Sequence, residues 1–122
     1  MRGIDISQFQ GNVNFDKAKK SGIEFVIIRA GFGRYETQRD PFFEKNYKAA
    51  KAAGLHVGAY WYSYAQSVDD AKQEAKVCMK IIKGKQFDFP IFFDLEERSQ
   101  FAKGRDHCDS LVKAFCGELE KN

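Results

Sequence analysis

The stretch Phe89-Pro90-Ile91-Phe92-Phe93-Asp94-Leu95-Glu96-Glu97 begins as an apolar run and then turns acidic. A short apolar run of this kind is typical of a strand that is buried on both faces, as in a parallel sheet. Because side chains alternate along a strand, Phe92, Asp94 and Glu96 share one face. Two carboxyl groups on one face raise the pKa of at least one of them, and such pairs at strand ends favour a functional site. The alternative is a plain polar mouth of the sheet, in which Arg or Lys side chains hold the two acids.

The segments before and after this stretch alternate between strand and helix patterns. Three further strands are predicted at residues 3–7, 23–30 and 57–64, because these runs are apolar and rich in β-branched or aromatic residues. Helices are predicted to follow the caps Asn14, Asp40 and Ser67, and a last amphipathic helix spans residues 108–119. The order βαβαβαβα with short connections predicts an α/β fold with parallel strands and right-handed crossovers.

Composition narrows the class of protein. The chain has 122 residues, 43% of them hydrophobic and 30% charged, which is typical of one globular domain over residues 1–122. A net charge of +3 is too small to indicate a nucleic-acid partner. No apolar run reaches the roughly 20 residues that a membrane span needs, and Met1-Arg2 leads into structure without a signal-peptide pattern.

Cysteine and histidine spacing predicts neither a disulfide nor a metal site. Cys108 and Cys116 lie eight positions apart on one predicted helix, which is about 12 Å along its axis and too far for a disulfide. Together with Cys78 they are expected to be buried apolar residues or free thiols. His56 and His107 are isolated, so we expect no metal ligation.

Polar and aromatic side chains gather where the predicted strands end. Asp5, Arg29 and Tyr62 fall at or near such ends, as do the two acids of the fourth strand. Carboxylates beside aromatic walls favour glycoside hydrolysis, in which one acid protonates the leaving oxygen and another stabilises positive charge. The alternative roles are plain packing for the tyrosines and, for Arg29, a structural pair with Asp5 or Asp94. A dinucleotide site is not supported, because the flexible loop predicted at residues 31–33 is too short.

Four motifs follow one another along nearly the whole chain: Gly3-Ile4-Asp5-Ile6-Ser7 with Gln10-Gly11, Phe25-Val26-Ile27-Ile28-Arg29-Ala30-Gly31, Gly58-Ala59-Tyr60, and Pro90 through Asp94-Leu95-Glu96. In order and spacing this series resembles the Chalaropsis-type lysozymes of glycoside hydrolase family twenty-five. The resemblance implies a parallel β/α barrel-type fold, of which about four βα units, a half-barrel, are present here. It also implies cleavage of the β-1,4 bond between N-acetylmuramic acid and N-acetylglucosamine in peptidoglycan, without a cofactor.

The resemblance also implies roles for individual residues. By position, Glu96 matches the family's general acid, and Asp94 and Asp5 match its other conserved acids. In the substrate-assisted route proposed for the family, Asp94 would orient and stabilise the acetamido group. The expected catalytic residues are therefore Glu96, Asp94 and Asp5, and the expected substrate-binding residues are Tyr60, Tyr62, Arg29 and Gln10.

The sequence departs from the family pattern in two ways, which affect the expected cleft and the expected barrel. Trp61 stands where the family often has His, and we expect it on a wall of the cleft. Family domains also run well beyond 122 residues, with later strands that complete the barrel and add cleft residues. Because four strands cannot close a barrel of eight, we expect either a homodimer that completes the barrel or a fragment whose other half is supplied elsewhere.

The sequence thus predicts a lysozyme-type glycoside hydrolase whose partner is the glycan of the bacterial cell wall. Weak or absent activity is expected for the half-barrel alone. The alternative is a catalytically silent module that binds wall glycan or serves assembly. Action on the wall places the protein outside the cell or in a phage or lysis system that delivers it, and neither a nucleic acid nor a membrane is an expected partner.

Overall fold

The computed structural model describes residues 2–11 and 13–120, in which four parallel strands form one sheet in the order β1-β2-β3-β4. Met1, Asn12, Lys121 and Asn122 belong to the predicted domain but lie outside the described residues. The elements are, in chain order, β1 (Gly3–Ile6), η1 (Gln8–Gln10), α1 (Phe15–Lys20), β2 (Phe25–Phe32), η2 (Glu36–Gln38), α2 (Phe43–Ala52), β3 (His56–Tyr62), α3 (Val68–Ile82), β4 (Phe92–Asp94), α4 (Arg98–Phe101) and α5 (Arg105–Glu120). The predicted α/β alternation with parallel strands is confirmed.

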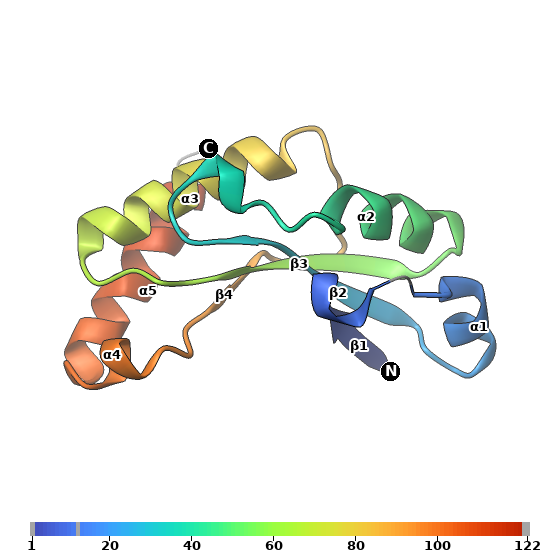
Figure 1. Ribbon diagram of the computed structural model, residues 1–122, viewed down its shortest axis with the longest axis horizontal. Coiled ribbons are helices and arrows are strands. Elements are labelled where there is room, and N and C mark those ends of the chain that lie inside the picture. The colour runs from blue at the N-terminus through green and yellow to red at the C-terminus, as the bar shows by residue number, and fades with distance from the viewer. Residues whose placement is uncertain (1, 12, 121–122) are drawn as a thin grey trace.

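Helices cover one side of the sheet. Helix α2 packs against β2 and β3, α3 packs against β2, and α5 lies against α3 and β4 (Figure 1). The strand side chains that point toward these helices are fully buried, as are Phe43, Ala75 and Phe115 from the helices themselves; the strand residues are Val26, Ile28, Ala30, Val57, Ala59 and Trp61. The alternate strand positions face the other side, so strand periodicity places core residues on one face and leaves the other for a site.

Local signals fix several helix ends as predicted. The Asn14 side chain accepts a hydrogen bond from the Lys17 N–H at 3.0 Å, and the Ser67 hydroxyl accepts one from the Asp70 N–H at 3.2 Å. The apolar spacing of the last helix also holds, since Cys108, Leu111 and Phe115 are its buried residues. None of the described helices is long and apolar enough to span a bilayer.

The fourth strand differs from its prediction. Only Phe92–Asp94 are strand, and the strand is not buried on both faces, because the Phe92 side chain is 47% exposed. The physical reason is position: β4 is an outer strand that pairs only with β3, and among the described residues helices cover only one of its faces. The alternation along the stretch is nevertheless correct, because Ile91 and Phe93 pack on the core.

The prediction of a loop at residues 31–33 is also wrong, since β2 continues through Phe32. The register shifts between Arg29 and Gly31, so that Gly31 pairs with Trp61. A Cβ on Gly31 would lie 2.7 Å from atoms of the Trp61 ring, which explains why glycine allows the strand to continue. Trp61 itself is fully buried and donates its ring N–H to the Gly33 carbonyl at 2.9 Å, so it does not form a cleft wall as predicted.

The three cysteines carry no disulfide, as predicted. Cys78 and Cys108 are buried, and Cys116 is half-buried. Burial raises the pKa of the Cys78 thiol to about 12, which keeps it a neutral apolar group at physiological pH.

Candidate active site

The sheet register brings the predicted site residues into neighbouring rows on the face away from the helices. Asp5 of β1 is level with Ile27 of β2, and Arg29 of β2 is level with Tyr60 of β3. Tyr62 of β3 is level with Asp94 of β4. Because the strands are parallel, these paired residues lie progressively closer to the carboxyl ends of the strands, and Glu96 lies just beyond the end of β4.

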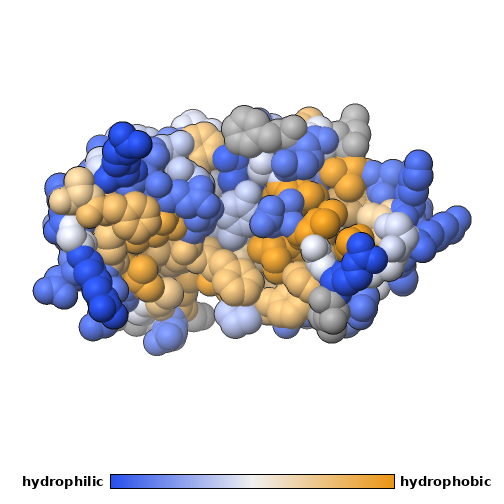
Figure 2. Space-filling view, turned by 90° about the horizontal axis from the view of Figure 1, so that it is seen from below, coloured by the Kyte–Doolittle hydropathy of each residue, from blue (hydrophilic) through white to orange (hydrophobic). Residues whose placement is uncertain are grey.

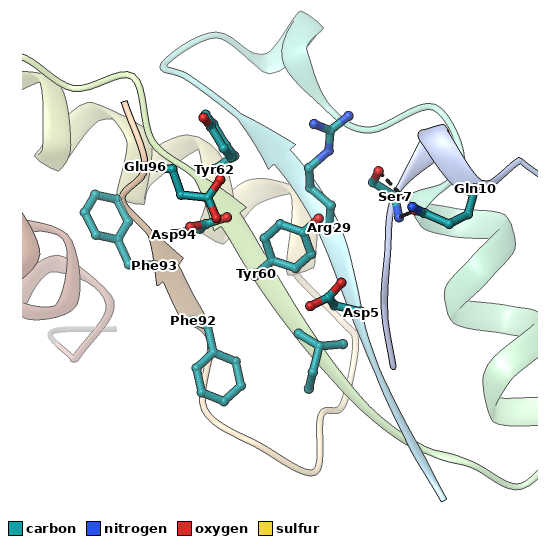
Figure 3. Close-up of a pocket in the computed structure, with 11 residues that line it drawn as sticks. Asp5, Ser7, Gln10, Arg29, Tyr60, Tyr62, Phe92, Phe93, Asp94 and Glu96 are labelled. Atoms are coloured by element: carbon teal, nitrogen blue, oxygen red, sulfur yellow. Dashed lines mark hydrogen bonds between the residues drawn. The ribbon is translucent and has the colours of Figure 1, made fainter. Parts of the chain in front are cut away.

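These rows line a cleft of about 650 Å³ (Figure 3). This volume lies within the range of ligand-binding pockets, roughly 300–1,000 Å³. All seven residues that the sequence singled out contribute to its lining, which consists of Asp5, Ser7, Gln10, Ile27, Arg29, Tyr60, Tyr62, Phe92, Phe93, Asp94 and Glu96.

The carboxyl groups of Asp94 and Glu96 lie beside each other in the cleft (Figure 3). Burial, which is the largest cause, together with the hydrogen bond to Glu96 and the negative charges of Glu96 and Asp5 raises the pKa of Asp94 to about 6. A hydrogen bond between two carboxyl groups requires a proton on one of them, so the pair can hold a proton that a substrate oxygen could accept. Among the described residues, no Lys or Arg forms an ion pair with Asp5, Asp94 or Glu96, which argues against the plain polar mouth.

A titration tests this coupling. The Glu96→Gln substitution removes a negative charge beside Asp94, so the pKa of Asp94 should fall from about 6 toward its ordinary value near 3.8. The contribution of burial stays, and the fall should therefore be partial. Carbon-detected NMR of the Asp94 carboxyl against pH measures it, and an unchanged midpoint would contradict the contact between the two carboxyls.

Arg29 has a different partner from those predicted. Its Nε lies 2.8 Å from an Asp40 carboxylate oxygen, and the exposed fractions of the two side chains are 8% and 0%. Asp40 also accepts hydrogen bonds from the Gln8 N–H at 3.0 Å and from the Phe42 N–H at 2.9 Å. The sequence predicts Asp40 as the N-cap of a helix, but α2 begins at Phe43 with Phe42 as its N-cap residue. One Asp40 oxygen accepts from the Phe42 N–H, and the other neutralises the buried guanidinium.

Tyrosines form the wall between the acid pair and Arg29. Burial is the largest cause of a Tyr60 pKa raised to about 12; the positive charge of Arg29 opposes the shift, and the negative charges of Asp5 and Asp94 contribute to it. Burial raises the pKa of Tyr62 to about 12 as well, with Glu97 and Glu96 as the nearby charges. Both phenols therefore keep their O–H at physiological pH, so that each presents a donor beside an aromatic ring.

Gln10 and Ser7 form the wall of the cleft at the end of β1. The Gln10 side-chain carbonyl accepts from the Ser7 N–H at 2.6 Å and from the Ser7 hydroxyl at 3.3 Å (Figure 3). Because this oxygen is engaged, the Gln10 amide NH₂ is the group that can donate to a ligand.

Sequence reasoning missed Phe93 as a lining residue and Asp40 as the support of Arg29. The Asp40-Pro41 pair marks Asp40 as a special position in the sequence, but a helix cap explains this pair as well as a role in binding Arg29 does. No group of three His, Cys, Asp or Glu residues in the described part of the chain could hold a metal ion.

Comparisons with known proteins identify a family and a relative that match nearly the whole chain. The family model "Glycosyl hydrolases family 25" matches residues 4–122. The autolytic lysozyme of Clostridium acetobutylicum is 38% identical over 119 residues, a match that covers 98% of this chain and 35% of that protein. The chain therefore spans about a third of the length of this curated relative.

Solved structures share the fold. A family GH25 lysozyme from Aspergillus fumigatus superimposes with a TM-score of 0.79 and 29% identity, covering 98% of this chain and 59% of the other. The modular autolysin LytC from Streptococcus pneumoniae, solved in complex with a synthetic peptidoglycan ligand, gives a TM-score of 0.82 at 23% identity, covering 98% of this chain and 29% of that one. At this identity the second match supports the fold alone.

Proposed function

This chain belongs to the glycosyl hydrolases of family 25, and we propose that it acts as a muramidase on bacterial peptidoglycan. The bond broken would be the β-1,4 link between N-acetylmuramic acid and N-acetylglucosamine. The observation that carries the proposal is the pairing of Asp94 and Glu96 in one cleft with Asp5 and two tyrosines. Two of the relatives named above, the autolytic lysozyme of Clostridium acetobutylicum and the family GH25 lysozyme of Aspergillus fumigatus, support the substrate class.

In the proposed mechanism Glu96 is the general acid. It donates its proton to the glycosidic oxygen as the bond to the anomeric carbon breaks, and it later takes a proton from the attacking water. The acetamido oxygen of the substrate attacks the anomeric carbon from the opposite face, so that two inversions retain the configuration. Asp94 accepts a hydrogen bond from the acetamido N–H and orients it, and Asp5 adds negative charge that stabilises the oxocarbenium-like transition state.

The remaining residues of the cleft would bind the glycan. Tyr60 and Tyr62 offer rings to the apolar faces of sugars and O–H donors to their hydroxyls. The Gln10 amide can donate to a sugar oxygen. Arg29 would contribute positive charge, although its pair with Asp40 makes support of the β2 end its principal structural role.

Release of reducing ends from purified cell wall tests the proposal. Incubation with the chain should generate new reducing-end muramic acid residues, which mass spectrometry of the soluble fragments identifies. Sedimentation of the chain with the wall in the absence of any released fragment would instead support a binding module and would overturn the muramidase. New reducing ends on glucosamine would place the cleavage at the other bond of the repeat.

We also propose that two copies of the chain associate through their outer strands. In the described sheet β1 and β4 each have one edge without a strand partner, and the exposed Phe92 lies on β4. Apolar side chains gather on the underside of the molecule, away from α2 and α3 (Figure 2). Unpaired apolar edges favour pairing with another chain, and a two-fold axis would place two sheets side by side.

Light scattering behind size exclusion measures the mass in solution. A dimer predicts about twice the chain mass of 14.0 kDa, with dissociation on dilution. A folded species at the monomer mass across the micromolar range would refute the association. We place this action outside the cell or in a phage or lysis system, and either route requires such a dimer to leave its clefts open to the wall.

A further inference from the structure

A buried polar cluster lies behind the wall of the cleft, where β3 ends. Its members are Ser63, Glu74 of α3 and Gln100 of α4, whose exposed fractions are 0%, 1% and 0%. Buried polar groups of this kind are costly unless every donor and acceptor has a partner. None of the three lines the cleft itself, so the cluster is separate from the groups that would touch a substrate.

The hydrogen bonds of the cluster form a closed set. The Ser63 hydroxyl accepts from the Gln100 amide at 3.0 Å and from the Ala65 N–H at 3.1 Å, and it donates to Glu74 at 2.8 Å. The other Glu74 oxygen accepts from the Tyr64 N–H at 2.9 Å. A hydroxyl has two acceptor sites and one proton, so all of its capacity is used and each Glu74 oxygen must act as an acceptor.

The Glu74 carboxyl, as the acceptor of the Ser63 proton, therefore orients the whole set. Burial raises the pKa of Glu74 to about 7, while the hydrogen bonds from Tyr64 and Ser63 oppose that shift. Because the Ser63 proton points to Glu74, the Ser63 oxygen is left to accept from Gln100. This fixes which way the Gln100 amide faces: its NH₂ also donates to the Ala65 carbonyl at 2.9 Å, and its carbonyl points the opposite way.

Both ends of the segment that carries the acid pair are attached to this cluster. The Ser63 N–H donates to the Asp94 carbonyl at 2.9 Å, and the Gln100 side-chain carbonyl accepts from the Glu97 N–H at 3.2 Å. Residues 95–97 lie outside any helix or strand, and the Glu96 side chain is exposed. The backbone that orients the Glu96 side chain is thus held by hydrogen bonds at Asp94 and at Glu97, and not by strand pairing at Glu96 itself.

We propose that Gln100, oriented by Ser63 and Glu74, is a positioning residue that holds the Glu96 carboxyl against that of Asp94. The inference deepens the proposed muramidase and rests on it only in the role given to the two acids. Gln100 touches neither acid side chain nor the cleft. It acts through the backbone of Glu97, where the segment after β4 enters α4.

The chain offers a matched pair of variants. Gln100→Leu keeps the size of the side chain and removes the bonds to Glu97, Ser63 and Ala65. Gln66→Leu is the control, because the Gln66 amide joins the same two segments through a bond to the Ser99 hydroxyl at 2.9 Å, but on the surface and without reaching Glu97. Both variants delete a glutamine contact between the end of β3 and α4, and only one of them releases the acid segment.

The readout is the titration of the Asp94 carboxyl in the full chain, followed by carbon-detected NMR. In Gln100→Leu the midpoint should fall from about 6 toward the value measured in Glu96→Gln, because a displaced Glu96 no longer adds its hydrogen bond and charge. The Glu97 amide should also exchange with solvent at least roughly tenfold faster. Gln66→Leu should keep the wild-type midpoint.

A folded Gln100→Leu protein with the wild-type Asp94 midpoint would overturn the proposal. If that variant does not fold, Ser63→Ala decides, since it deletes one oxygen, frees the Gln100 amide and predicts a fall in the same direction; a wild-type midpoint there overturns the proposal equally. Because the titration needs no turnover, it separates this inference from the muramidase itself. Failure of wall hydrolysis with the expected shifts would refute the function and leave the positioning role standing.

Discussion

The Glu96→Gln variant should lose hydrolysis of cell-wall glycan by roughly 10²–10⁴-fold, the contribution that a positioned general acid makes. Gln has the size of Glu and can donate a hydrogen bond, but it has no proton to transfer to a leaving oxygen. The fold should be unaffected, because Glu96 is exposed and lies outside the helices and strands. The rate is measured as reducing ends released per chain over long incubation, a readout that remains sensitive if the wild-type rate is low.

Glu24→Gln is the matched control for this variant. Glu24 is an exposed glutamate just before β2, at the end of the sheet opposite the cleft, so the same loss of one charge should leave the rate unchanged. Wild-type hydrolysis in Glu96→Gln would remove Glu96 from the mechanism. An equal loss in both variants would point to net charge and its effect on wall binding.

The Asp40→Ala variant should lose about 3–5 kcal/mol of unfolding free energy, the cost of leaving a buried charge without its partner. The Arg29 guanidinium is the charge in question, because it pairs with Asp40 at 2.8 Å and both side chains are almost fully buried. The substitution also removes the acceptor of two backbone N–H groups, those of Gln8 and Phe42. Urea unfolding at one fixed protein concentration measures the change, since association would make stability depend on concentration.

The Glu36→Ala variant provides the comparison. It deletes an ion pair of equal length, 2.8 Å to Lys80, in which the side chains are 61% and 71% exposed. Water already solvates both charges there, so its removal should leave the unfolding midpoint nearly unchanged. A loss of unfolding free energy below about 1 kcal/mol in Asp40→Ala would show that Arg29 finds water or another acceptor. This result would contradict an Arg29–Asp40 pair from which water is excluded.

The sequence by itself determined the features that depend on a few neighbouring residues. The caps at Asn14 and Ser67 act over three positions, and the apolar stripe of α5 repeats with the helical period. The alternation of a strand placed Asp94 and Glu96 on one face, and parallel strands brought Asp5 to the same edge as that pair. For this reason strand ends alone indicate Asp5, Arg29, Tyr62, Asp94 and Glu96, whereas Tyr60 and Gln10 come from the resemblance to the family; all seven line the cleft.

Only the tertiary structure decided which groups meet across long stretches of chain. Arg29 pairs with Asp40 because β2 extends to Phe32 and the chain then returns beside it, a path that no local pattern encodes. The ring of Trp61 has room in the core because Gly31 of β2, its neighbour in the shifted register, carries no Cβ. Gln100 reaches Ser63 across 37 positions. Propensity and periodicity act over one or two turns of chain, whereas register and burial are set by all the segments that pack together, and these decide the partners of buried polar groups.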